Sequence, residues 1–110
     1  MPRTVYSLPL LAAVMAVGSP VSAVVPNGFT WVVRDISGTW ACPTSGVGEI
    51  IFEADGITFL QYWVPPGHQD GFHWEGRVVI AGLSTLTVAT AGDAGFTAQF
   101  RLSGYELSLP

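Results

Sequence analysis

The sequence predicts an all-β protein, an antiparallel up-and-down meander of about eight short strands that forms a small closed or partly open barrel. Beyond residue 23, glycine or proline interrupts every stretch within a few residues, which leaves no room for a long helix. Apolar residues recur with a period of two, as they do in half-buried strands. Every connection between candidate strands is too short for a parallel crossover, so the strands should pair antiparallel.

The first 23 residues have the order of a cleavable secretory signal peptide. Arg3 supplies a positive charge, an apolar stretch follows at residues 8–17, and Ala23 places a small side chain at the cleavage position. The apolar stretch is about half as long as the roughly twenty residues that a membrane-spanning helix needs. We therefore expect cleavage after Ala23, no membrane insertion after cleavage, and a secreted or periplasmic single domain of residues 24–110.

That domain contains eight candidate strands separated by turn signals. They are residues 29–34, 36–42, 49–54, 57–64, 72–80, 83–90, 96–102 and 105–109. Asp55 and Gly56 form the two-residue signal for a tight hairpin, and Ser103 with Gly104 predicts the last hairpin. A meander that is apolar on one face must bury that face, and closing the sheet also removes exposed edge strands. A small barrel satisfies both requirements.

The charge distribution excludes several classes of partner. The chain has no lysine, and its formal net charge is −4. All eight acidic residues lie after residue 23 against three arginines, so residues 24–110 carry a formal charge of −5. Such a surface is unsuited to phosphate backbones, which argues against nucleic acid and against anionic membranes. Charged residues make up only 11% of the chain, which favours a self-association surface or an apolar pocket.

Cys42 is the only cysteine in the sequence, so no disulfide can form within one chain. Two interpretations stay open. Cys42 is either a small buried apolar residue or the bridge of a homodimer, since an odd cysteine in a secreted protein suggests pairing between molecules.

A Gly-x-Trp motif at Gly38 and Trp40, in an early strand of the meander, resembles the calycin-type barrels and in particular the short bacterial lipocalin-like domains. Residues 52–59 and 100–109 look similar to those domains too, so the resemblance runs from residue 36 to the end of the sequence. It implies a structural plug at one barrel end, formed by Trp40 under Arg101. It also implies a binding function without catalysis and without a cofactor.

The densest group of potentially reactive side chains surrounds the loop at residues 65–71. It comprises His68, Asp70, His73 and Glu75. Their spacing matches no metal-binding motif, and His73 and Glu75 should share the outward face of one strand, so we expect a solvated surface and no metal site. Ser45 with His68 and Asp70 lacks the local context of a nucleophilic triad. We therefore expect that the protein is not an enzyme.

Aromatic side chains supply the candidate binding site. Tyr62 and Trp63 enter a proline-rich loop, and Phe72 and Trp74 follow it, so the four could grip a small apolar ligand at a barrel mouth. The leading hypothesis is an exported, non-catalytic, lipocalin-like module for such a ligand. The alternative is a protein-interaction or protease-inhibitor-like domain acting on another exported protein. A self-associating structural protein is a third interpretation.

Overall fold

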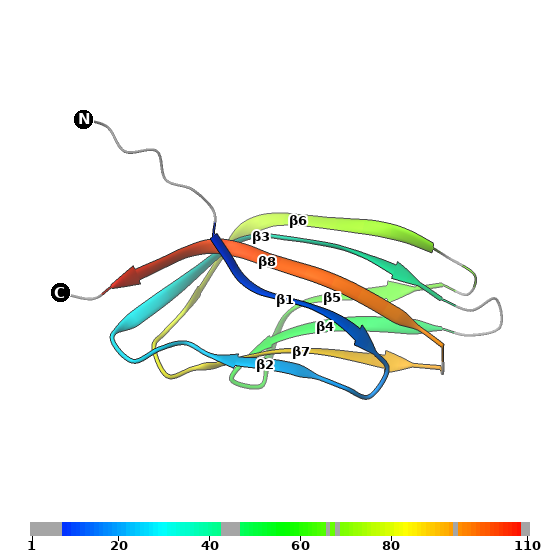
Figure 1. The fold of residues 1–110 in the computed structure, drawn as a ribbon, viewed down its shortest axis with the longest axis horizontal. Coiled ribbons are helices and arrows are strands. Elements are labelled where there is room, and N and C mark those ends of the chain that lie inside the picture. Colours follow the sequence, from blue (N-terminus) through cyan, green and yellow to red (C-terminus); the bar gives the residue numbers. More distant parts are fainter. Residues whose placement is uncertain (1–7, 43–46, 66, 68, 94, 109–110) are drawn as a thin grey trace.

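The computed structural model describes residues 8–42, 47–65, 67, 69–93 and 95–108, and within these ranges the chain forms eight strands and no helix (Figure 1). The strands are β1 (Leu8–Ala16), β2 (Val21–Val24), β3 (Phe29–Ala41), β4 (Gly48–Ala54), β5 (Ile57–Val64), β6 (Gln69–Ile80), β7 (Thr85–Gly92) and β8 (Thr97–Ser108). All six strand pairs are antiparallel. The prediction of an all-β, antiparallel fold is confirmed, but the eight strands are not the eight predicted ones, because β1 and β2 lie in residues 8–24 and only six strands follow in the described part of the chain. The described residues include no helix long and apolar enough to cross a membrane.

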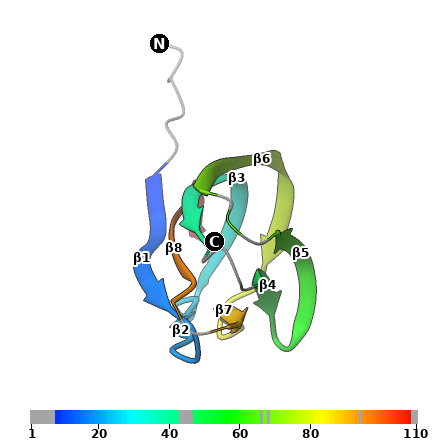
Figure 2. The ribbon, with the colours of Figure 1, turned by 90° about the vertical axis from the view of Figure 1, so that its right-hand side faces the viewer.

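The strands form two four-stranded sheets that face each other as a sandwich. One sheet, called sheet A below, has the order β1-β8-β3-β6, and the other, sheet B, has the order β2-β7-β4-β5. The pairing is that of one long hairpin, with β4 against β5 at its tip, β3 against β6, β2 against β7 and β1 against β8. Figure 2 shows this hairpin rolled into two layers, the double-Greek-key arrangement of jelly rolls.

The sheets do not close into a barrel, so the barrel prediction is not confirmed. The up-and-down order is not found either, because β4 and β5 are the only sequence neighbours among the described strands that pair with each other. A short connection can form a hairpin within one sheet or cross to the facing sheet. Both arrangements give the same alternation of apolar residues, which is why the sequence pattern did not separate them.

Two predicted strand breaks are absent. Residues 29–41 form the single strand β3, and residues 97–108 form β8, which runs straight through the predicted hairpin at Ser103 and Gly104. Arg34 is a bulge in β3, where the pairing register shifts between Val33 and Asp35. A Cβ atom at Gly104 would meet the backbone carbonyl of Val32. Gly104 therefore allows β8 and β3 to approach each other closely at the bulge, and it does not form a turn.

The irregularity continues across the whole of sheet A. β6 shifts register opposite Arg34, at Gly76 and Arg77, and β1 shifts between Pro9 and Leu11 beside Ser103. The four strands therefore bend along one line, as bulges increase local twist. Figure 1 shows the long strands of sheet A curving over sheet B.

The strands β1 and β2 come from the residues that the sequence indicates as a signal peptide. β1 pairs with β8 from Leu8↔Gly104 to Ala16↔Thr97, and β2 pairs with β7 from Val21↔Val88 to Val24↔Thr85. The structure thus uses residues 8–24 as one side of the sandwich. Cleavage after Ala23 stays a prediction, and it would remove this side.

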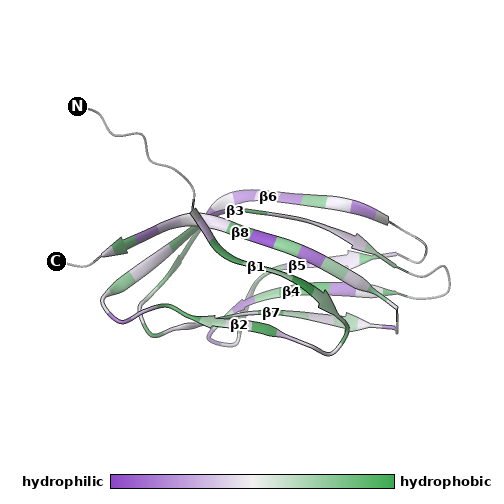
Figure 3. Ribbon diagram, viewed as in Figure 1, coloured by the Kyte–Doolittle hydropathy of each residue, from purple (hydrophilic) through white to green (hydrophobic). Residues whose placement is uncertain are grey.

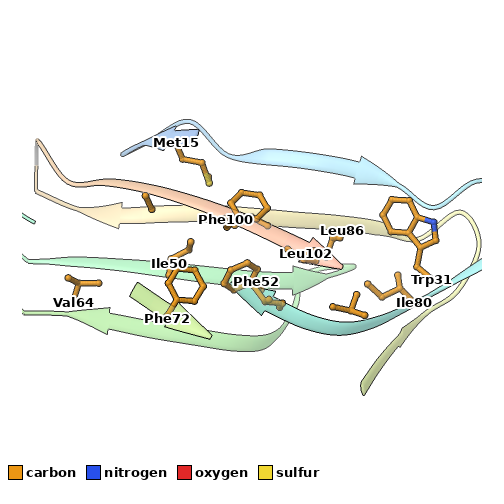
Figure 4. Packing of buried hydrophobic residues seen from close by; sticks show 14 of the residues in the cluster. Met15, Trp31, Ile50, Phe52, Val64, Phe72, Ile80, Leu86, Phe100 and Leu102 are labelled. Carbon is orange, nitrogen blue, oxygen red and sulfur yellow. The ribbon is translucent and has the colours of Figure 1, made fainter. Parts of the chain in front are cut away.

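The core lies between the two sheets and is built from their alternating inward residues (Figure 4). On β8 the predicted inward set, Ala98, Phe100 and Leu102, is buried, while the residues between them are exposed. Figure 3 shows this alternation of polar and apolar residues along β8, whereas most of β1 is apolar. Phe52 is fully buried and meets Phe100 edge-on, with ring centroids 5.8 Å apart. Burying such a side chain contributes about 1.5–3 kcal/mol.

The predicted hairpin at Asp55 and Gly56 is confirmed. Both residues have positive φ angles, 50° and 80°, which suits the tight turns whose twist matches that of the flanking strands. The Asp55 carboxylate accepts a hydrogen bond of 2.8 Å from the backbone N–H of Thr85 on β7, and the Asp55 N–H donates to the Thr85 carbonyl at 2.9 Å. The turn is thereby fixed to the neighbouring strand.

Candidate functional site

The four predicted ligand-binding residues are not gathered in one place. Tyr62 and Phe72 are close, with ring centroids 5.0 Å apart, and Phe72 is buried. Trp74 lies on the inward side of β6, where its ring covers Gly76. Trp63 lies on the other side of β5 from Tyr62 and is 69% exposed. The structure therefore divides the set into an interior part and one surface residue.

The interior residues Tyr62 and Phe72 form a cluster of aromatic rings together with Trp40. The ring of Trp40 lies parallel to that of Phe72, at 4.9 Å between centroids and an interplanar angle of 10°, and its centroid is 5.6 Å from that of Tyr62. Such stacking contributes about 0.5–1.5 kcal/mol beyond the area that it buries. Burial also raises the pKa of the Tyr62 phenol above its ordinary value of 10.0. The rings of Tyr62 and Phe72 therefore pack against each other and against Trp40, in the place where the sequence predicted contacts with an apolar ligand.

The Gly-x-Trp motif has a packing role in this stack. A Cβ atom at Gly38 would lie 2.8 Å from the Phe72 ring, so the glycine makes the room that lets Phe72 reach Trp40. The Trp40 indole nitrogen is buried and makes no hydrogen bond to any described residue. Arg101, the expected partner of the plug, is exposed on the outer face of sheet A, whereas Trp40 packs against the core. The structure does not bring Trp40 and Arg101 together.

Clefts also lie outside the sandwich, on the outer face of sheet A. Two of them, of about 450 and 480 Å³, share Val14 of β1 and Gln99 of β8 and adjoin each other; we call them together the outer groove. Its lining comprises Ala12, Ala13, Val14, Ser37, Gly38, Thr39, Trp40, Ala41, Asp70, Thr97, Ala98, Gln99, Phe100 and Arg101. Its exposed side chains combine the apolar Ala12 and Val14 of β1 with hydroxyl, amide, carboxylate and guanidinium groups, so the groove offers both apolar and polar contacts. None of the four predicted ligand-binding residues lines it.

Sequence reasoning missed the outer groove because β1 supplies one of its walls. Ala12 and Val14 belong to the predicted signal peptide, and Val14 is 79% exposed. The alternation of polar residues at Gln99 and Arg101 was the available signal, since outward residues of neighbouring strands must share a face. The pattern alone indicates a solvated face and not a groove.

A third, polar cleft of about 360 Å³ lies along the line of bulges and is lined by Arg34, Asp35, His73, Glu75 and Tyr105. His73 and Glu75 share a strand face as predicted, with 3.6 Å between Nε2 and Oε1. Both side chains are more than half exposed, so their attraction is weak. No three His, Cys, Asp or Glu residues within the described ranges lie close enough together to hold a metal ion.

The other residues weighed for chemistry are placed as follows. His68 and Ser45 lie outside the described residues. Asp70 is exposed and lines the outer groove. Cys42 is buried at 8% exposure within the core cluster, so a disulfide to a second copy would require this end of the sandwich to open. Homodimerisation through Cys42 stays a prediction.

Comparisons of the chain with protein-family models, with curated proteins and with solved structures found no match.

Proposed function

We propose that the protein is an exported, non-catalytic binding module that recognises another exported protein through its surface. The leader-like features of residues 1–23 support export. Trp63 is the observation that carries the binding role. A tryptophan that is 69% exposed on a folded domain contributes little to the core, and tryptophan is among the side chains most enriched at the centres of protein interfaces.

The strand around Trp63 fits this role. β5 is an edge strand of sheet B, and none of its eight residues is charged. Its outer backbone groups are available for pairing with a partner strand. Beside Trp63, the Gln61 amide donates a 2.7 Å hydrogen bond to the Glu49 carboxylate on β4, so this face of sheet B has polar contacts near the aromatic anchor. An apolar centre with polar surroundings is the usual composition of an interface.

A lipocalin-like carrier of a small apolar ligand is the second candidate, since it accords with the low charge of the chain. It would require an internal cavity among its predicted ligand-binding residues, where Phe72 instead stacks on Trp40 and packs against Tyr62. A surface interaction needs no such cavity. This difference is why we favour the protein-interaction module.

The test places a photoreactive benzoylphenylalanine at position 63 and, as a matched control, at position 79 in separate proteins. Val79 is also apolar and exposed, at 57%, but lies on β6 at the edge of the other sheet. Irradiation of the exported fraction should give one protein adduct of discrete mass at position 63 and none at position 79. Equal adducts at both positions, or none at position 63, would contradict the proposal.

A second measurement separates the two candidates. The fluorescent apolar probe N-phenyl-1-naphthylamine should show no one-to-one binding to the purified protein, because Phe72 packs against Trp40 and Tyr62. Saturable one-to-one binding that disappears in a Tyr62→Ala variant would support the carrier instead. The Trp63→Ala variant should keep its free energy of unfolding within about 0.5 kcal/mol, as expected for an exposed position.

A further inference from the structure

The side of the sandwich formed by residues 8–24 has an unusual composition. No residue between Leu8 and Val24 is charged. The side chains of this segment that pack against the core are Leu10, Leu11, Ala13, Met15, Val17, Val21 and Ala23. Met15 is the most enclosed of them at 3% exposure, whereas its neighbour Val14 is 79% exposed on the outer face. The segment is thus an apolar pair of strands, one in each sheet, with one inner and one outer face.

Its two strands each complete a different sheet. β1 extends sheet A by pairing with β8, and β2 extends sheet B by pairing with β7. The Thr90 hydroxyl of β7 donates a 3.0 Å hydrogen bond to the Ala16 carbonyl at the end of β1, so β1 is also held to the other sheet. Figure 2 shows β1 and β2 together on one side of the molecule, away from β5.

Cleavage after Ala23 would open this side. All of β1 and three of the four residues of β2 would leave, and β8 would lose its outer pairing partners along residues 97–104. Loss of Met15 would leave an apolar space between the sheets, next to the buried residues Phe100 and Ala98. A strand edge that has lost its pairing partner, next to an open apolar space, can pair with a strand of another protein.

We propose that processing after Ala23 converts the β8–β7 side of the sandwich into an open binding site, called the seat below. The seat takes an extended, uncharged, apolar segment of an exported partner protein, and this segment pairs with β8 as β1 does. The chemistry of this occupant follows from the segment seated there in the structure, which has small or apolar inner residues in antiparallel register with β8. The charge of −5 on residues 24–110 disfavours an acidic occupant. The inference rests on the proposed export of the protein and not on Trp63.

The test keeps the whole chain. The recognition sequence of a site-specific protease is inserted at the exposed turn of Pro26, Asn27 and Gly28. The folded protein is then cut at this turn, so that the segment containing β1 and β2 stays bound to the rest of the protein without a covalent link. A fluorescent synthetic peptide of residues 8–24 is then added, and its fluorescence anisotropy reports exchange into the seat. Two variant peptides are compared with it, Met15→Asp and Val14→Asp.

We expect the unmodified peptide to exchange into the seat. The Met15→Asp peptide should bind at least about tenfold more weakly, because it puts an unpaired charge between the sheets. The Val14→Asp peptide should bind within about threefold of the unmodified one, because that side chain faces solvent. No exchange, or equal weakening by the two aspartates, would overturn the proposal.

Two further outcomes bear on the occupant. The mass of the protein from its own exported fraction should begin at Val24, and a mature protein that retains residues 8–23 would overturn the proposal. A processed protein that dimerises and thereby excludes the peptide would show that a second copy, not a partner protein, takes the seat. Peptide exchange should be unchanged in a Trp63→Ala chain, so this test and the cross-linking test at position 63 fail independently.

Discussion

The hydroxyl of Thr90 donates a hydrogen bond to the backbone carbonyl of Ala16, 3.0 Å away, and so joins strands that belong to different sheets. Thr90 is buried at 7% exposure, and the hydrogen bond is partly buried. β1 is therefore held through its pairing with β8 and also through a side chain of β7. The amino-terminal segment of β1 and β2 is bound to both layers of the fold.

Replacing Thr90 with valine should lower the free energy of unfolding of the full chain by about 1 kcal/mol, the usual contribution of one hydrogen bond. Thr87→Val is the matched control, because Thr87 lies on the same strand and its 3.3 Å contact with the Ser22 hydroxyl is exposed. We expect less than about half that loss for the control. Urea titration of both variants checks this prediction. Equal losses in the free energy of unfolding would show that the Thr90 hydrogen bond contributes no more than the exposed contact of Thr87.

Replacing Gly38 with alanine should disrupt the aromatic stack. The added methyl group would meet the carbonyl of Gln99 and the ring of Phe72, so we expect a loss of about 1–3 kcal/mol and a weaker near-ultraviolet circular dichroism signal. At Gly71, on the outward side of β6, the nearest atom to an added Cβ is the Gly38 carbonyl oxygen at 3.3 Å. Gly71→Ala should therefore cost clearly less, and a larger loss there would contradict the packing role of Gly38.

Asp55 should contribute to stability in a pH-dependent way. Its pKa lies below the ordinary value of 3.8, first because the backbone N–H of Thr85 donates to its carboxylate and second because the Ser84 side chain does. Since the folded pKa is the lower one, the contribution is fully present above about pH 4 and is lost as the pH falls through the folded pKa. Urea midpoints measured from about pH 5 to pH 2 should fall less steeply in Asp55→Asn, which keeps a residue tolerant of positive φ. Equal slopes would contradict the assignment.

Tyr62 should make the stability of the protein depend on pH in alkaline solution. Burial raises the pKa of its phenol above 10.0, so the unfolded chain releases this proton more readily than the folded one. The protein should therefore lose stability as the pH rises above about 10. Phenolate absorbance during titration should contain one component above that pH, absent from Tyr62→Phe. A Tyr62→Phe protein with unchanged alkaline sensitivity would disprove the link.

Local features of the fold were readable from the sequence, and long-range ones were not. The turn at Asp55 and Gly56 and the inward face of β8 depend on neighbouring residues, and both were predicted. The pairing of Leu8 with Gly104 depends on residues at opposite ends of the chain. The hairpin expected at Ser103 and Gly104 was wrong, because the bulge at Arg34 on the adjacent strand requires a glycine there.

The candidate site was likewise predictable only in part. Tyr62 and Phe72 were expected to lie together, and their centroids are 5.0 Å apart. The position of Trp63 follows from the strand period, since consecutive residues point to opposite faces and Trp63 cannot join Tyr62 inside. The outer groove was out of reach of sequence reasoning, because its floor and walls come from β1, β3 and β8, which only the rolled topology brings together.

The pairing of the first strand with the last sets an order of events during biosynthesis. Because Leu8 to Ala16 pair with residues 97–104, β1 has no partner until almost the whole chain has left the ribosome. Contacts so distant in sequence form late and slowly. Throughout synthesis the apolar amino-terminal segment therefore stays without its partner strand, and the receptor capture that the proposed export requires would compete in time with closure of the sandwich.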